Sequence, residues 1–141
     1  MTAISWNQKT IDEFHAKNGR GIGPWRDNLL LMTAMGAKSG DSITTPLVYR
    51  HIGDDYVVIA SKGGAPKHPK WYGNIKANPV VEIEVAAASG TQHFKARARP
   101  VPGGEEHDRL YALLTEVWPG FADFQKKASR TIPVVVLEPI S

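Results

Sequence analysis

The residues with the most chemical character lie in one short stretch, SKGGAPKHPKWYGN, at residues 61–74. It holds three lysines and a histidine together with two prolines, three glycines and a Trp-Tyr pair. Lysines carry compact positive charges, and tryptophan offers a flat apolar surface. The combination indicates a stiff loop that binds an anion beside a flat ring. The residue types also allow a simpler interpretation, in which the lysines are solvated and Trp71 belongs to the core.

The positive charge of the chain is concentrated around this stretch. The formal net charge is only +3, but no acidic residue lies between Asp55 and Glu82. Four lysines fall in that interval: Lys62, Lys67, Lys70 and Lys76. A local cluster of this kind can bind nucleic acid, an anionic surface or one polyanionic small molecule.

Two segments offer backbone donors for such an anion. The turn GAKSGD, at residues 36–41, is flanked by glycines, so its N–H groups can face a ligand beside the charge of Lys38. A helix with Pro69 as its first residue would direct the N–H groups of Lys70, Trp71 and Tyr72 outward. We therefore expect both segments to converge on one cleft.

Catalytic groups of other kinds are scarce. The five histidines include no pair at helical spacing, so no metal site is expected. Ser39 and Ser61 lie outside any GxSxG pattern, and neither a GxGxxG unit nor a Walker pattern is present. The absence of cysteine excludes thiol nucleophiles and zinc-thiolate sites. An enzyme with this sequence would borrow its chemistry from a cofactor.

Length and composition predict one domain spanning residues 1–141. A chain of this length can bury a single core, and contents of 22% charged and 42% hydrophobic residues are ordinary for a soluble protein. No apolar run approaches the roughly 20 residues of a membrane-spanning helix, and the first residues lack the apolar region of a signal peptide. Since cysteine is absent as well, we expect a cytoplasmic protein.

Apolar periodicity predicts a mainly β, α+β fold. Strands are expected at residues 29–32, 44–52, 56–61, 80–85, 91–101 and 131–140, and helices at 8–17, 71–78 and 104–118, with a further turn or two after Pro119. In the first helix Ile11 and Phe14 share one face, which predicts a helical cap within residues 1–18. Six strands mostly in hairpin order, without strand-helix alternation, predict an antiparallel barrel with flanking helices.

Three segments resemble blocks of a known family. ASKGGAPKHPKWYGNIKANP, at residues 60–79, resembles the ASKGG(A)xxHPxWYxNLxANP signature of the deazaflavin (F420)-dependent nitroreductases, a family that includes F420H2-dependent quinone reductases. LLLMTAMGAKSGDSITTPLVY, at residues 29–49, is similar to the block LLLTTTGRKSGxPRxxPLxY, and RTIPVVVLEP, at residues 130–139, is similar to the closing strand. The segments occur in the order that the family has.

The resemblance implies a split β-barrel and hydride transfer from reduced coenzyme F420 (F420H2) to a quinone, a nitro-aromatic or an activated enone. The phosphodiester and glutamate tail of F420 is a polyanion of the kind that the lysines suggest. The cofactor-binding positions that follow are Lys38, Ser39, Pro46, Leu47, Ala60, Ser61, Lys62, Pro69, Lys70, Trp71, Tyr72 and Asn74. Ser61 and Tyr72 are also the candidate catalytic residues, since each could deliver a proton to the product.

Two departures from the family pattern bear on the ligand. Ala37 and Ile43 stand where the family has arginines, which predicts weaker binding of the anionic tail. Trp118, Phe121 and Phe124 fall where some members carry tyrosines on the substrate side, which predicts flat apolar acceptors. Simple core packing is the other interpretation of these three aromatic residues.

Other functions use the same residues. The protein could carry or sequester F420 without turning over a substrate, or its barrel could bind FMN. A nucleic-acid module is not expected, because the sequence has neither an RNP-like aromatic pattern nor a recognition helix. The expected partner is a small-molecule hydride acceptor; a homodimer and a weak peripheral association with a membrane are further expectations.

Overall fold

Six strands form the framework of the chain. The structure, a computed structural model, describes residues 6–22, 27–37, 40–61, 68–88, 90–128 and 130–140. Its elements are α1 (Trp6–Lys17), β1 (Leu29–Met35), β2 (Ser42–Ile52), β3 (Asp55–Ile59), α2 (Lys70–Ala77), β4 (Val80–Ala87), β5 (Gly90–Val101), α3 (Glu105–Val117), α4 (Gly120–Lys127) and β6 (Val134–Pro139).

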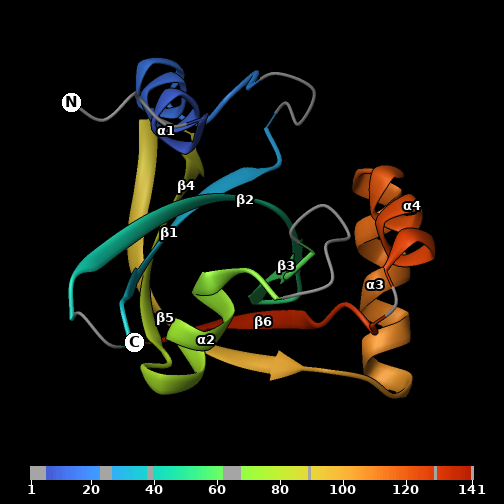
Figure 1. The fold of residues 1–141 in the computed structure, drawn as a ribbon. Coiled ribbons are helices and arrows are strands. Elements are labelled where there is room, and N and C mark those ends of the chain that lie inside the picture. Colours follow the sequence, from blue (N-terminus) through green and yellow to red (C-terminus); the bar gives the residue numbers. More distant parts are fainter. Residues whose placement is uncertain are drawn as a thin grey trace.

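The strands close into an antiparallel barrel in the order β1-β2-β3-β6-β5-β4 (Figure 1). The longest pairing is the β4–β5 hairpin, which runs from Val80 opposite Arg97 to Ala87 opposite Gly90. Closure between β1 and β4 uses a shorter register, centred on Met32 opposite Ile83. The fold class predicted from the sequence, an α+β protein with a six-stranded antiparallel barrel and flanking helices, is confirmed.

One face of each strand fills the barrel. In β5, for example, Ala96 and Ala98 are buried while Lys95 and Arg97 are exposed, which follows from the alternation of side chains along a strand. Apolar residues from the strands form one interior cluster. Helix α2 adds its Trp71, Tyr72 and Ile75 side chains to this cluster.

The other helices cover the outside of the barrel on two sides (Figure 1). Helices α3 and α4 pack on the outward side chains of β3 and β6, through residues such as Leu114 and Phe121. Helix α1 packs on β1 through Phe14, which is completely buried. Helix α1 therefore lies with its apolar face on the barrel.

The end of α1 depends on a glycine. Gly19 has a left-handed backbone (φ 77°), and its N–H donates to the carbonyl of Phe14 at 2.8 Å. A Cβ at this position would lie 2.9 Å from the Phe14 ring. Both the backbone conformation and the contact therefore favour glycine here.

Our prediction for the start of α2 is wrong by one residue. Pro69 is the N-cap, with an extended backbone (φ −63°, ψ 152°), rather than the first helical residue. Its carbonyl accepts a hydrogen bond from the Tyr72 N–H at 3.0 Å. An N-cap carbonyl commonly accepts the first bond of a helix, so the Tyr72 N–H is not one of the outward donors that we expected.

Candidate functional site

Strand β2 changes partners along its length. Ser42–Val48 pair with β1, and only Tyr49–Ile52 pair with β3. Among the described strands, the first half of β2 therefore has a partner on one edge only. We call its other edge the open edge. It offers backbone groups that a ligand can use in place of a strand.

The direction of these backbone groups follows from one hydrogen bond. The Tyr49 N–H donates to the Asn28 carbonyl at 2.9 Å, on the β1 side. Because successive residues of a strand direct their backbone groups to opposite edges, Thr44, Pro46 and Val48 direct theirs to the open edge. Proline has no N–H to leave unpaired, so Pro46 suits such an edge.

The side chains of the two predicted β2 contacts lie on different faces. Pro46 is opposite Leu31, which packs on the outside of the barrel under α1. Leu47 is opposite Leu30 and packs against the interior cluster. The Pro46 ring is thus buried on the outer face, whereas the half-buried Leu47 side chain points toward the core.

Helix α2 supplies the aromatic residues of the predicted site. Trp71 and Tyr72 are 7% and 5% exposed, and their rings meet edge to face at 6.3 Å. Burial raises the pKa of the Tyr72 phenol, and the charge of Arg130 only partly offsets this. Tyr72 therefore keeps its proton at neutral pH. Pro69 is half-buried and Lys70 is exposed at the start of the helix.

The turn after β1 lies against α2. The backbone N–H of Ala37 donates to Oδ1 of Asn74 at 3.0 Å, and the Gly36 N–H donates to the Asp41 carbonyl at 2.8 Å. Asn74, a predicted cofactor residue, thus joins the helix to the glycine-flanked turn. The turn and the helix that we expected to converge are in contact. Lys38, Ser39 and Lys62, which we also predicted, lie outside the described residues.

Sequence reasoning missed Arg130, which joins β6 to the end of β3. Its Nη2 donates to the carbonyl of Ser61 at 3.0 Å and, at 3.4 Å, to that of Ala60. Its Nη1 donates to Nδ1 of His68 at 3.0 Å. Ala60 is completely buried and Ser61 is half-buried. The backbone carbonyls of these two predicted residues thus bind a cationic side chain. The sequence signal that could have indicated this role is the position of Arg130 directly before the predicted closing strand.

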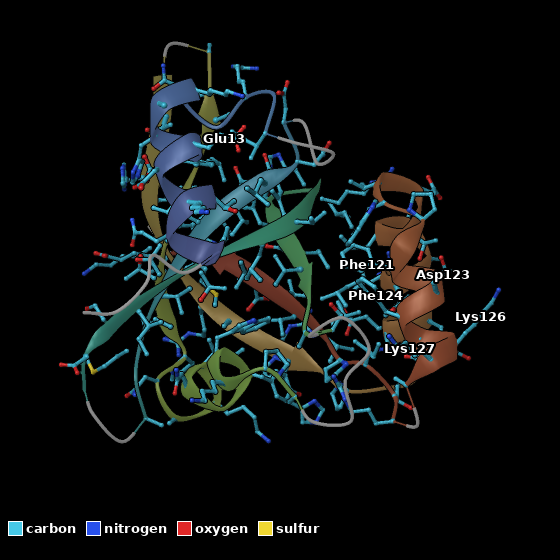
Figure 2. The ribbon with its side chains drawn as sticks, turned by 45° about the horizontal axis from the view of Figure 1, so that its top comes forward. Glu13, Phe121, Asp123, Phe124, Lys126 and Lys127 are labelled. Atoms are coloured by element: carbon cyan, nitrogen blue, oxygen red, sulfur yellow. The ribbon has the colours of Figure 1, made fainter. Side chains whose placement is uncertain are left out.

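The aromatic residues predicted for the substrate side form one cluster, with Trp118 at the end of α3 and the other two on α4. Trp118, Phe121 and Phe124 pack edge to face, with ring centroids 5.2 to 6.2 Å apart. Figure 2 shows Phe121 and Phe124 directed toward the barrel and Lys126 directed away from it. Phe121 is buried, whereas Trp118 and Phe124 are partly exposed. The latter two are the members that a substrate could reach.

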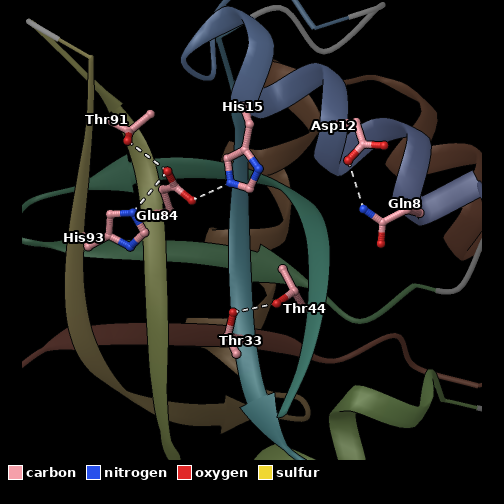
Figure 3. Close-up of polar contacts among 8 residues, drawn as sticks. All are labelled: Gln8, Asp12, His15, Thr33, Thr44, Glu84, Thr91 and His93. Atoms are coloured by element: carbon pink, nitrogen blue, oxygen red, sulfur yellow. Dashed lines mark hydrogen bonds and ion pairs between the residues drawn. The ribbon is translucent and has the colours of Figure 1, made fainter.

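A second polar region lies under α1. Glu84, on β4, accepts hydrogen bonds from His15 of α1 at 3.0 Å and from Thr91 at 2.8 Å, and its other contact is His93 at 3.1 Å (Figure 3). Burial raises the pKa of Glu84, but the hydrogen bonds of Thr91 and His15 and the charges of the two histidines outweigh it, so the pKa is lowered overall. We call these four residues the Glu84 cluster.

The Glu84 cluster borders a cavity of about 340 Å³ between α1 and the outer face of the barrel. A hydrogen bond of 2.8 Å between Thr33 and Thr44 closes one side of it (Figure 3). The described part of the chain contains no group of three or more histidine, cysteine or acidic side chains able to hold a metal ion. In the same part, no helix is long and apolar enough to cross a membrane.

The fold and the site define a class of protein. An antiparallel barrel in which one strand changes partners along its length, with a helix adding a tryptophan to the interior, is the fold of a split-barrel protein. The family model described as F420H(2)-dependent quinone reductase matches residues 6–139. The chain belongs to this family.

Individual relatives agree with this assignment. The chain is 42% identical over 129 residues to the F420H(2)-dependent quinone reductase Rv1261c of Mycobacterium tuberculosis strain H37Rv, covering 88% of this chain and 83% of the relative. A solved F420-H2 dependent reductase, FDR-A, superposes with a TM-score of 0.70 at 39% identity, over 79% of this chain and 94% of that one. A solved domain-swapped dimer is also similar, with 39% identity, a TM-score of 0.69 and coverage of 79% and 80%.

Proposed function

We propose that this protein is an F420H2-dependent reductase that passes a hydride to a quinone or to a related flat acceptor. The observation that carries the proposal is the open edge of β2, in a chain of the F420H(2)-dependent quinone reductase family. Nitro-aromatics and activated enones are acceptors of the same chemical kind, because each contains an electron-poor π system that a hydride can reduce.

The residues at the split fit coenzyme F420. The open edge of β2 offers hydrogen-bonding groups to a heterocycle. The amino end of α2 and the exposed Lys70 favour an anion there. Lys38, Ser39 and Lys62 are proposed to hold the phosphate and tail, and Asn74 to fix the turn that carries the first two. FMN, which also has a flat ring and a phosphate, is the alternative.

The chain would contribute binding, orientation and exclusion of water. When bound, F420H2 supplies the hydride, and a quinone that accepts it also takes up a proton to become a hydroquinone. Tyr72 keeps a proton at neutral pH because burial raises its pKa, and Ser61 carries a hydroxyl at the end of β3. We propose that one of these two hydroxyls relays the proton. Holding donor and acceptor in contact can lower the barrier by roughly 7 to 11 kcal/mol.

The acceptor is proposed to bind against α4. Trp118 and Phe124 are partly exposed members of an aromatic cluster that also packs on the outward side chains of β3. These rings offer stacking area. Such a wall favours a flat apolar acceptor over one that needs several hydrogen bonds.

One experiment tests this function and its alternatives. Purified protein is mixed with F420H2 and menadione, and the return of the absorbance of oxidised F420 is followed. A rate that depends on protein concentration and saturates with menadione is expected. Tight binding of F420 without turnover would favour a carrier, and a yellow, flavin-containing preparation would favour FMN. Absence of both binding and turnover would contradict the proposal.

Two expectations about partners remain. A homodimer is proposed because one similar solved structure is a domain-swapped dimer, and light scattering of the purified protein tests it. The described residues of α1 give no support to membrane association, since Phe14 and Ile11 pack on the barrel. Flotation with lipid vesicles would test that expectation, and we expect the protein to remain unbound.

A further inference from the structure

Arg130 contacts both ends of the segment between β3 and α2. Ser61, whose carbonyl it binds at 3.0 Å, directly precedes residues 62–67, and His68, bound at 3.0 Å, directly follows them. A guanidinium is a planar fork of donors, so one side chain can hold two acceptors at a fixed separation. A lysine has no such fork.

The contact with Arg130 also fixes the state of His68. Because a guanidinium can only donate, Nδ1 of His68 must be unprotonated, and a neutral ring then carries its proton on Nε2. Burial of part of the ring lowers the His68 pKa, and the charges of Arg130 and Lys76 lower it further. The described groups that face His68 are Arg130, Lys76 and the ring of Tyr72, whose centroid is 4.8 Å away.

Arg130 is itself held by α4. The side-chain amide of Gln125 donates to the Arg130 carbonyl at 2.8 Å and accepts from the Ile132 N–H at 2.9 Å. Nε2 of His107 contacts the Ile132 carbonyl at 2.7 Å. The helix that carries Phe124 is thus joined, through Gln125 and Arg130, to the segment that follows β3.

We infer that Arg130 is a positioning residue, which holds Ser61 and His68 at a fixed separation and so sets the end of β3 and the start of α2 relative to α4. The inference rests on the proposed function, because it assigns Ser61 and α2 to the F420 site. It adds that cofactor geometry depends on one further arginine, and on a neutral His68.

The test compares Arg130→Lys and Arg130→Gln with Arg109→Gln, which removes an exposed arginine of α3. Affinity for oxidised F420 and the kcat and KM for F420H2 are measured at pH 7.5. Arg130→Lys, which keeps the charge, is expected to weaken F420 binding about tenfold, the effect of losing roughly 1.4 kcal/mol of hydrogen bonding. Arg130→Gln is expected to weaken it at least as much. Wild-type affinity in both variants, as in Arg109→Gln, would overturn the inference.

A pH profile separates positioning from simple stability. F420 binding by the wild type is expected to weaken as the pH falls through the His68 pKa, which lies below its usual value of 6.5, because a protonated His68 cannot accept from Arg130. His68→Asn places an amide oxygen near the position of Nδ1, which accepts but does not titrate. This variant is expected to bind F420 with a flat profile between pH 5 and 7.5. A wild-type profile that is already flat would contradict the clamp.

A third measurement does not involve F420. Nitrogen-15 NMR of the cofactor-free wild type is expected to show His68 with an unprotonated Nδ1 at neutral pH, and the signal is expected to change in Arg130→Gln. A protonated Nδ1 would overturn the inference even if neither arginine variant folds. If the wild type fails to bind F420 while His68 shows the expected tautomer, the proposed function fails and the contact itself stands.

Discussion

The split and the Glu84 cluster are two polar regions on the outside of one barrel, and they use their polar groups differently. In the Glu84 cluster the carboxylate contacts His15, Thr91 and His93, so its hydrogen-bonding capacity is satisfied within the protein. At the split, the open edge of β2 has no strand partner among the described residues. The Glu84 cluster fastens helix α1 to the barrel, and the split leaves backbone groups for a ligand. Polar content alone does not distinguish the two.

The largest effect on stability and on F420 binding is expected from a change in α2. Trp71→Ala should cost about 3 to 5 kcal/mol of unfolding free energy, because it removes a buried ring from the interior cluster. Loss of F420 binding should accompany it. Urea denaturation and F420 titration measure the two effects. Trp71→Phe, which keeps an aromatic ring, should recover most of the stability; a stable Trp71→Ala protein with normal affinity would assign Trp71 to neither role.

Glu84→Gln should affect the other region only. Loss of charged hydrogen bonds to His15 and Thr91 is expected to cost about 1.5 to 3 kcal/mol of stability while leaving the affinity for F420 unchanged. Thermal unfolding and F420 titration provide the measurements. A large loss of F420 affinity without loss of stability would mean that the cluster belongs to the cofactor site.

The lowered pKa of Glu84 gives this comparison a pH signature. A carboxyl whose pKa is lower in the folded state stabilises the protein above its unfolded value of about 4.5, and this contribution is lost as the pH falls through the folded value. Wild-type stability should therefore decline below pH 4.5 more steeply than that of Glu84→Gln. Parallel acid-denaturation curves would show that Glu84 is not the group responsible.

Lys38→Ala should weaken F420 binding by about fivefold, since one partly exposed ionic contact contributes about 1 kcal/mol. The slope of affinity against salt concentration should also decrease, because fewer ionic contacts remain to be screened. Lys95→Ala, which removes an exposed lysine of β5, is the matched control. Equal salt dependence in Lys38→Ala and the wild type would remove Lys38 from the site.

The smallest effect is expected at the join between α3 and α4. The Tyr111 hydroxyl donates to the Phe121 carbonyl at 2.6 Å, and burial raises its pKa to about 12. Tyr111→Phe should cost about 1 kcal/mol of stability and raise the KM for menadione only slightly. Spectroscopic titration of the wild type should show one tyrosine that ionises only near pH 12. If this ionisation is missing from the titration of Tyr111→Phe, it belongs to Tyr111.

Much of the fold could be predicted because its signals are local. Alternation in residues 91–101 identifies β5, and the prolines at 69 and 79 bracket α2 to within one residue. The approach of the glycine-flanked turn to α2 was expected because both segments offer backbone donors for an anion, but the contact of Asn74 with Ala37 that joins them was not. The error at Pro69 arose because a φ near −63° suits an N-cap as well as a first helical residue.

The remaining features depend on contacts between distant parts of the chain. Arg130 reaches Ser61 because β3 and β6 pair, with Ile59 opposite Val134, and no local pattern shows that pairing. His93 lies opposite Glu84 in the β4–β5 register, so the hairpin could have suggested that contact. His15 is 69 residues away from Glu84 and could not have been predicted to join it.

The open edge of β2 has a consequence for the protein without its ligand. An unpaired strand edge is a template on which a strand of another molecule can add, and this is a common start of aggregation. Pro46 interrupts that template in the middle, since it offers no N–H to an incoming strand. A small molecule bound along the edge would cover the backbone groups of Thr44 and Val48, which the proline leaves accessible. If coenzyme F420 binds along this edge as proposed, the supply of cofactor would therefore also help to keep the folded chain dispersed.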